Sequence, residues 1–226
     1  MKMILRKQQR SGLLLLVLSI VLLNTKTILA ADAGSPVELL RTISSNVIQI
    51  LVNEKATLKA HPDKVYEIVN NYILPNLDDI TMAKLALGKN WRKASRAQKL
   101  RFINEFRTLL IRTYSKSLLE YKNQQINFFP LRLNGNAKIA SVRAEVIQPG
   151  GPPVPLVYRV RLKNNTWKVY DIKVDGISLV TSYRGTFTQE VRKGGINGLL
   201  NYLHEKNGKL KPLQDSLTNK KEAENT

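Results

Sequence analysis

The chain has 226 residues and a net charge of +19, with 36 basic residues against 17 acidic ones and no cysteine. A chain without cysteine has neither disulfide bonds nor thiolate chemistry, so an exported form has to be held together by an apolar core. Apolar residues make up 43% of the sequence, which is enough for a core of one domain.

The first thirty residues have the pattern of a secretory signal peptide. Basic residues precede an apolar run over residues 13–23, and small residues at the end of the stretch offer a cleavage site. The run ends at Asn24, whereas a membrane-spanning helix needs about 20 apolar residues. We therefore expect residues 1–30 to be a signal peptide, with cleavage after Ala30 or Ala33.

The expected mature chain stays strongly basic. The leader contains five basic residues and no acidic one, which leaves 31 basic residues against 17 acidic ones, a net charge of +14. Such a charge attracts polyanions, among them anionic lipid head groups and nucleic acid. The alternative is a solvated surface that keeps the protein soluble by repulsion.

Residues 35–121 follow a helical period. Ser35 and Pro36 are typical of an N-cap and a first helical turn, and a second helix follows Pro62 and ends at Pro75. A short helix over residues 79–87 is closed by a glycine that suits a helix C-terminus.

The longest predicted helix begins at Ser95, which forms a capping box with Gln98 and is followed by apolar residues at helical spacing up to about residue 122. One helix of this length is able to line the side of a small domain.

After Asn123 the apolar period changes to two, which predicts β-strands. Short turns join them, so neighbouring strands should be antiparallel. The four predicted strands are residues 126–133, 138–147, 155–163 and 167–174. One face should carry the apolar residues Val142, Ala144, Val146, Leu156, Tyr158, Val160, Leu162, Tyr170, Ile172 and Val174.

The C-terminal part returns to helix, with a break at Gly194 and Gly195. Residues 207–226 are polar and predict a disordered tail. The sequence therefore indicates an α+β fold in a single domain over residues 35–206, in which N-terminal helices pack on a curved four-stranded antiparallel sheet and C-terminal helices close over it.

No group of residues predicts catalysis or metal binding. His61 and His204 have no carboxylate at ligand spacing, and Asp78 and Asp79 stand where aspartates cap a helix. The glycine-rich stretch at residues 193–198 lacks the strand and the Gly-Lys-Ser/Thr ending of a phosphate loop. We expect no enzyme activity, no metal and no cofactor.

Two long stretches carry a family resemblance. ILPNLDDITMAKLALGKNWRKASRAQKLRFINEFRTLLIRTY (residues 73–114) and NTWKVYDIKVDGISLVTSYRGTF (residues 165–187) resemble the MlaC family of periplasmic phospholipid-binding proteins, also described as toluene-tolerance auxiliary proteins. The match extends over roughly residues 35–206.

The resemblance implies a cone-shaped fold akin to nuclear-transport-factor-like domains, with a deep apolar pocket for the acyl tails of a phospholipid. It also implies a carrier in the periplasm of a Gram-negative bacterium. We expect this carrier to be a monomer and not to bind nucleic acid. This carrier moves lipid between an outer-membrane lipoprotein complex and an inner-membrane ABC transporter complex and so maintains outer-membrane lipid asymmetry.

On this hypothesis, the lipid contacts come from the apolar sheet face, the two helices before it and the start of the last helix. The predicted lipid-binding residues are Met82, Leu85, Phe106, Leu110, Tyr114, Val142, Ala144, Tyr158, Val160, Tyr170, Ile172, Tyr183 and Arg184. Arg184 either pairs with a carboxylate, which we favour, or meets the lipid phosphate.

Two other functions stay open from the sequence. A small-molecule enzyme on the same cone would use a pocket carboxylate such as Asp171 or Asp175, although period two places both on the wet face of the sheet. A polyanion-binding module would bind nucleic acid with a steep dependence on salt and would need no apolar cavity.

Overall fold

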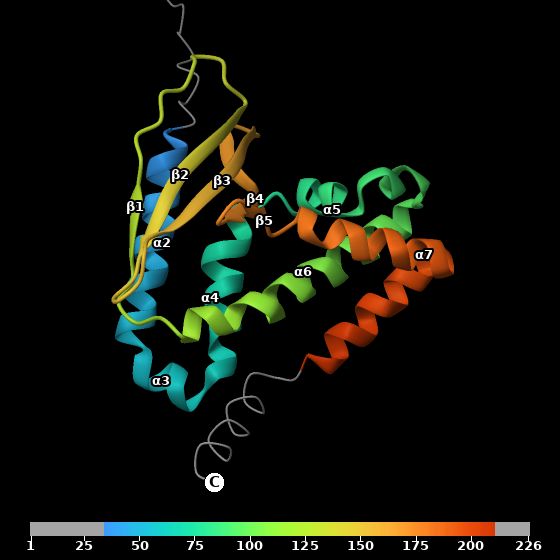
Figure 1. Ribbon diagram of the computed structural model, residues 1–226, viewed down its shortest axis with the longest axis horizontal. Helices are drawn as coiled ribbons and strands as arrows, with labels where there is room; N and C mark the ends of the chain where they lie inside the picture. Colours follow the sequence, from blue (N-terminus) through green and yellow to red (C-terminus); the bar gives the residue numbers. More distant parts are fainter. Residues whose placement is uncertain (1–33, 211–226) are drawn as a thin grey trace, which may run out of the picture. The chain divides into compact units, whose positions relative to one another are not determined.

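The computed structural model describes residues 34–210. The predicted signal peptide lies outside the described residues, as does the tail from residue 211 onward. Helices occupy the two ends of the described chain, and an antiparallel sheet lies between them in sequence (Figure 1). None of the helices within residues 34–210 has the length and apolar character needed to cross a membrane.

The N-terminal helices begin as the sequence predicts. Helix α2 (Pro36–Asn53) starts after Ser35, whose hydroxyl accepts a hydrogen bond from the Val37 N–H at 3.2 Å. Short elements follow it: α3 (Lys55–Ala60), the 3-10 turn η2 (Pro62–Lys64), α4 (Val65–Ile68), the π-helical turn η3 (Val69–Ile73) and the 3-10 turn η4 (Leu74–Asn76). The single helix expected between Pro62 and Pro75 is thus broken into turns of different pitch.

Two helices follow before the sheet. Helix α5 (Asp79–Leu87) has Asp78 as its N-cap, and the 3-10 segment η5 (Gly88–Lys93) leads to α6 (Arg96–Leu119). The capping box at the start of α6 is confirmed, because Ser95 and Gln98 each accept a hydrogen bond from the other's backbone N–H.

The sheet has five antiparallel strands in the order β1-β2-β3-β4-β5. They are β1 (Gln125–Phe128), β2 (Ile139–Ile147), β3 (Val154–Lys163), β4 (Thr166–Val174) and the two-residue β5 (Ile177–Ser178). The expected α+β class and the antiparallel order are confirmed, with one short strand more than the four expected.

A β-bulge changes which side chains of β4 face which way. Arg159 lies opposite Asp171 but Val160 lies opposite Val169, so Tyr170 is an extra residue in β4. A bulge breaks the alternation of side chains along its strand. Tyr170 therefore packs among helical residues, and its expected place on the apolar face of β2 and β3 is wrong; Val169 packs there instead.

Asp171 stays on the face where the alternation places it, beside Arg159, but the turn after β4 covers that face and it is not wet there. The Asp171 side chain is 0% exposed, whereas Asp175 is exposed. One Asp171 oxygen accepts hydrogen bonds from the Ser178 hydroxyl at 2.7 Å and the Val180 N–H at 3.4 Å, and the other lies 3.8 Å from Arg159. Asp171 thus holds the turn that connects β4 to the last helix.

The 3-10 turn η6 (Thr181–Tyr183) leads into α7 (Arg184–Lys209). The predicted break is confirmed as a kink, because Gly194 and Gly195 have non-helical backbone angles and Gly195 has φ of 64°. α7 continues beyond the expected domain boundary at residue 206: Asn207 is buried and donates a hydrogen bond to the Glu105 carbonyl at 3.0 Å.

Among residues 34–210, three apolar clusters form the core. The helical cluster joins α5, α6 and α7, the sheet cluster joins β1–β4 to the first half of α2, and a third cluster joins the second half of α2 to α3 and α4. Along α2, Val37 and Leu40 cover the sheet, whereas Val47 and Leu51 meet Leu58. α2 thus lies along one face of the sheet and continues past its end (Figure 1).

Candidate functional site

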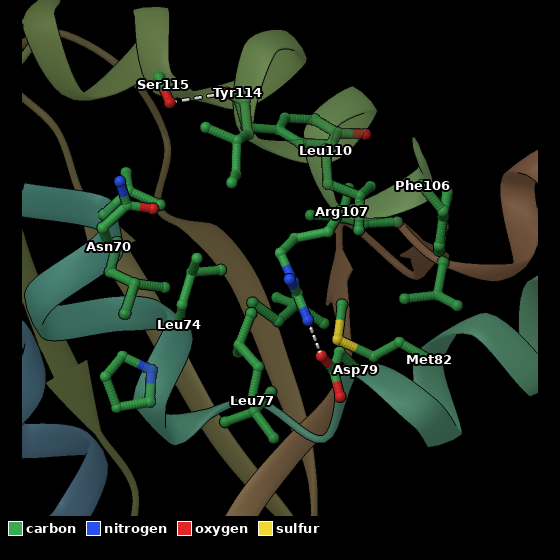
Figure 2. Close-up of a pocket in the computed structure, with 18 of the residues that line it drawn as sticks. Asn70, Leu74, Leu77, Asp79, Met82, Phe106, Arg107, Leu110, Tyr114 and Ser115 are labelled. Atoms are coloured by element: carbon green, nitrogen blue, oxygen red, sulfur yellow. Dashed lines mark hydrogen bonds and ion pairs between the residues drawn. The ribbon is translucent and has the colours of Figure 1, made fainter. Parts of the chain in front are cut away.

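A cavity of about 500 Å³ lies between α6 on one side and residues 69–77 with the start of α5 on the other (Figure 2). Part of β4 and the turn after β5 complete its wall. It is lined by Val69, Asn70, Ile73, Leu74, Pro75, Leu77, Asp79, Met82, Ile103, Phe106, Arg107, Leu110, Ile111, Tyr114, Ser115, Leu118, Val169, Ile172, Leu179 and Val180.

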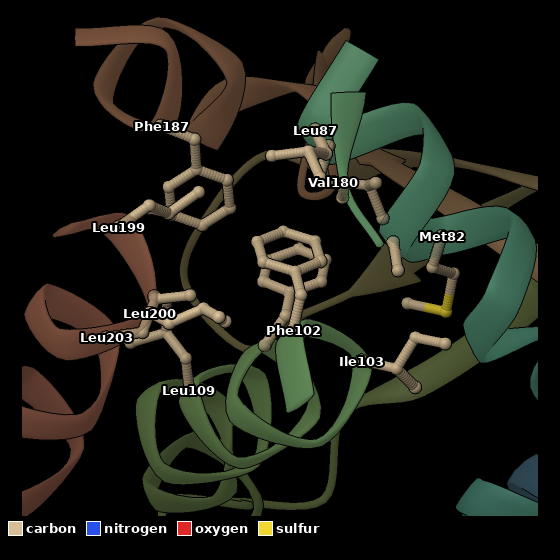
Figure 3. Close-up of a cluster of buried hydrophobic side chains, with 14 of the residues drawn as sticks. Met82, Leu87, Phe102, Ile103, Leu109, Val180, Phe187, Leu199, Leu200 and Leu203 are labelled. Atoms are coloured by element: carbon tan, nitrogen blue, oxygen red, sulfur yellow. The ribbon is translucent and has the colours of Figure 1, made fainter. Parts of the chain in front are cut away.

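Helix α6 has two apolar faces. One face, spaced at three and four residues, lines the cavity with Ile103, Phe106, Leu110 and Tyr114. The other carries Phe102 and Leu109, both 0% exposed, which pack on α7 in the helical cluster (Figure 3). Because α7 covers only one of these faces, the other is left to border the cavity.

The opposite wall is the segment of mixed helical turns. Figure 2 shows Leu74 and Leu77 pointing into the space below α6. The Lys168 ammonium donates to the Pro75 carbonyl at 2.6 Å, and the Asp78 N–H donates to the Val169 carbonyl at 2.8 Å. These two bonds fix the end of the segment to β4, so the cavity wall is attached to the sheet.

Asp78 joins this wall to α5 and β3. It is 2% exposed, and its carboxylate accepts from the Thr81 hydroxyl at 2.7 Å, the Thr81 N–H at 3.3 Å and the Lys163 ammonium at 3.3 Å. Burial alone would raise the pKa of Asp78, but the hydrogen bonds from Thr81 and the nearby Lys163 outweigh burial and lower it. The carboxylate is therefore ionised at neutral pH.

Two charged side chains stand on the otherwise largely apolar wall. Arg107 of α6 and Asp79 at the start of α5 form an ion pair, and their side chains are 36% and 35% exposed. In Figure 2 the Arg107 side chain extends from α6 toward Asp79 across the space between the two walls. The charge of the cavity wall is thus concentrated at one place that water reaches.

Tyr114 adds a neutral polar group to the cavity wall. Burial raises the pKa of its phenol well above the ordinary value, and a hydrogen bond with Tyr183 raises it further. Tyr183 also packs edge-on against Phe106, with ring centroids 5.5 Å apart. Tyr183 therefore supports two lining residues from behind without lining the cavity itself.

The structure divides the predicted lipid-binding residues into groups. The cavity wall includes Met82, Phe106, Leu110, Tyr114 and Ile172. The helical cluster contains Tyr170, with Leu85 and Tyr183 packed against it. The sheet cluster contains Val142, Ala144 and Val160, with Tyr158 packed against them.

The last group does not reach the cavity, because α2 and the neighbouring strands cover that part of the sheet. Tyr158 illustrates this, since its ring stacks on Phe128 of β1, with ring centroids 6.0 Å apart.

Arg184 is tied to a backbone carbonyl rather than to a carboxylate or a cavity. Its Nε and Nη2 donate to the Leu85 carbonyl at 3.0 Å and 2.6 Å, near the C-terminal end of α5. It also lies against Gly88, where an added Cβ would meet Arg184 Nε at 3.2 Å. The structural role that we favoured for Arg184 thus has a different partner from the expected carboxylate.

Sequence reasoning missed one wall of the cavity and its ion pair. Residues 69–77 look like an ordinary amphipathic helix, and nothing local indicates a π-helical turn there. Arg107 could have been recognised from the sequence, because it lies four residues after Ile103 and three before Leu110 on the same face of α6. A charged residue within an apolar stripe is a candidate for a buried or ligand-facing position.

Neither aspartate of the enzyme hypothesis lines this cavity: Asp171 is committed to the turn after β4, and Asp175 is exposed. Within residues 34–210 there is also no group of three His, Asp or Glu side chains arranged to hold a metal ion. The cavity wall is largely apolar apart from the Arg107–Asp79 pair, which suits it to an apolar molecule.

Comparisons with known proteins agree with this geometry. The model of the MlaC protein family matches residues 41–205. The toluene tolerance protein ttg2D of Pseudomonas putida is 29% identical over 177 residues, which cover 78% of this chain and 82% of that protein. The intermembrane phospholipid transport system binding protein MlaC of Haemophilus influenzae is 26% identical over 186 residues, covering 81% and 86% of the two chains.

A solved structure has the same fold. The phospholipid-binding protein of Ralstonia solanacearum, determined in complex with a phospholipid, superposes with a TM-score of 0.68 at 32% identity and covers 78% of this chain and 99% of its own. Because the family model spans most of the described residues and the fold agrees, this chain belongs to the MlaC family.

Proposed function

We propose that this protein is a periplasmic phospholipid carrier that moves glycerophospholipids between the inner and outer membranes and so maintains the lipid asymmetry of the outer membrane. The observation that carries the proposal is the apolar cavity of about 500 Å³ between α6 and residues 69–77. The names of the relatives support it, since one is a phospholipid transport binding protein and another was determined with a phospholipid.

The physical reason for a carrier is the cost of exposing acyl chains to water. Each buried methylene stabilises the lipid by about 0.8 kcal/mol, so a diacyl lipid with about 30 methylenes would cost roughly 25 kcal/mol to expose. A carrier replaces the membrane interior with another apolar environment and needs no chemical step. The proposed partners are an inner-membrane ABC lipid transporter complex and an outer-membrane lipoprotein complex.

The first experiment asks whether lipid is present in the cavity. The protein is purified from a Gram-negative periplasm, extracted with organic solvent and analysed by mass spectrometry. We expect phospholipid in the extract. Absence of phospholipid, together with no binding of added phospholipid, would contradict the proposal.

The second experiment locates the lipid. Leu110→Trp places a bulky side chain on the cavity wall, and Leu100→Trp places the same side chain on α6 at a position that is 56% exposed. We expect lower lipid occupancy in the first variant and unchanged occupancy in the second, with similar melting temperatures. Equal occupancy in both variants would place the lipid elsewhere.

The third experiment tests transport itself. Labelled phospholipid in donor vesicles should reach acceptor vesicles faster when the protein is added, and Leu110→Trp should reduce the rate. A protein that holds lipid but does not accelerate transfer would be a lipid-binding protein without carrier activity.

A further inference from the structure

Arg107 differs from two other arginines whose roles in this fold are evident. Arg112 donates to the backbone carbonyls of Asn207 and Leu210, which secures the end of α7 against α6. Arg184 donates to the Leu85 carbonyl near the end of α5. Both serve backbone carbonyls near helix ends, as structural arginines commonly do. Arg107 instead stands on the cavity wall, and its partner is a carboxylate.

The guanidinium of Arg107 has spare hydrogen-bonding capacity. It has five N–H donors in a planar fork. One of its terminal nitrogens, Nη2, donates to Asp79, and within the described residues Nε and Nη1 of Arg107 have no protein acceptor. With the side chain 36% exposed, these donors are available to water or to a ligand.

The ion pair borders the space that a ligand in the cavity would occupy. Figure 2 shows Arg107 reaching from α6 to Asp79 with Met82 and Leu77 on either side. A lipid seated along these apolar residues, with its polar end at the water-exposed ion pair, therefore brings that end to the guanidinium. Apolar surroundings strengthen a charge-assisted hydrogen bond compared with the same bond in water.

Asp79 shows that this place accepts an anion. It lies in the first turn of α5, where the helix dipole favours negative charge, and its carboxylate also meets Arg107. A phosphodiester has the same charge as a carboxylate and two oxygens that match the guanidinium fork.

We infer that Arg107 recognises the phosphodiester of a bound phospholipid, which competes with the Asp79 carboxylate for the guanidinium. This inference rests on the proposed function. Asp79 is 35% exposed, so water solvates its carboxylate when Arg107 turns away. The exchange of one anion for another keeps the guanidinium paired in both states, which makes loading and release reversible.

The test measures preference for the phosphate. Delipidated protein is titrated with a phosphatidylglycerol and with a diacylglycerol that has the same acyl chains, both delivered from cyclodextrin. In Arg107→Gln we expect affinity for phosphatidylglycerol to fall about 10- to 100-fold, the range for a hydrogen bond to a charged group, and affinity for diacylglycerol to stay unchanged. In Asp79→Asn we expect affinity for phosphatidylglycerol to rise a few-fold, because the competing carboxylate is removed.

A matched control removes an ion pair whose two residues do not line the cavity. Glu190→Gln breaks the surface pair between Glu190 and Lys193, whose atoms are 2.7 Å apart, and should change neither affinity. A free fatty acid with one of the same acyl chains tests whether Arg107 recognises a carboxylate instead of a phosphodiester. If Arg107→Gln weakens the fatty acid but not the phosphatidylglycerol, the guanidinium recognises carboxylates and the inference is wrong.

Other outcomes also decide the matter. Equal losses of both lipids in Arg107→Gln, or no loss of either, would overturn the inference while leaving the carrier proposal intact. Wild-type protein that binds neither lipid would overturn the carrier proposal itself. If Arg107→Gln does not fold, Asp79→Asn provides the test. An unchanged ratio of the affinities for phosphatidylglycerol and diacylglycerol in that variant contradicts competition between Asp79 and the phosphodiester.

Discussion

The size of the cavity predicts how affinity should depend on acyl-chain length. A methylene fills about the same space as a water molecule in the liquid, about 30 Å³. A cavity of about 500 Å³ therefore holds one chain of roughly 16 carbons at that packing. A second chain of similar length would require the two walls to move apart.

The perturbation is the chain length of a monoacyl phospholipid with a fixed head group, varied from about 8 to about 20 carbons. Each added methylene should tighten binding by about 0.8 kcal/mol, or about fourfold in Kd, until the cavity is full. Beyond about 16 carbons the gain per carbon should fall toward zero, because further methylenes stay in water. Competition with a fluorescent monoacyl probe, below the critical micelle concentration of each lipid, measures the series.

Leu110→Trp provides an internal control for the same series. The larger side chain occupies part of the cavity, so the plateau should begin at a shorter chain than in the wild type. Leu100→Trp, outside the cavity, should leave the plateau where it was. A constant gain per carbon up to the longest chain would refute a cavity of fixed size, and no dependence on chain length would refute binding of the chain in the cavity at all.

Further predictions concern stability. Phe102→Ala removes a 0% exposed ring that packs between Phe106 and Phe187, and should lower the free energy of unfolding by about 3–5 kcal/mol in denaturant titrations; a loss below about 1 kcal/mol would contradict that packing. The lowered pKa of Asp78 means that its ionised form stabilises the fold above the unfolded pKa, and this stabilisation is lost as the pH falls through the folded pKa. Asp78→Asn should therefore cost about 1–2 kcal/mol at neutral pH, and the difference from wild type should disappear in acid; a difference that does not depend on pH would point to the hydrogen-bond geometry instead. Removal of bound lipid should lower the melting temperature, since ligand at about 1,000 times its Kd adds about 4 kcal/mol, and an unchanged melting temperature would show that the lipid does not stabilise the folded state.

Local sequence signals predict most of the helix and strand assignments. The capping box at Ser95, the Ser35 cap and the break at Gly195 are all present in the structure where the sequence places them. Each depends on contacts within a few residues, so a single sequence is enough to recognise them. The alternation of β2 and β3 is predicted for the same reason, because burial on one face repeats every second residue.

The errors in the sheet come from a feature that local pattern does not encode. The bulge that places Tyr170 in the helical cluster depends on how β4 pairs with β3. A single extra residue puts the side chains before it out of phase with those after it, and the sequence alone does not say where it is inserted. Alternation along β4 was therefore a correct guide for Ile172 and a wrong one for Tyr170.

The sequence by itself determined most of the helices and strands, the antiparallel order of the main strands, the apolar stripe of α6 and the family resemblance. The tertiary structure decided which apolar residues form the core and which border the cavity. Ala144 and Leu110 are equally apolar in the sequence, yet Ala144 is buried beneath α2 and its neighbouring strands whereas Leu110 faces residues 69–77. The physical reason is that periodicity shows which face of an element avoids water, while the covering partner, here α7 or α2, depends on packing between segments far apart in sequence.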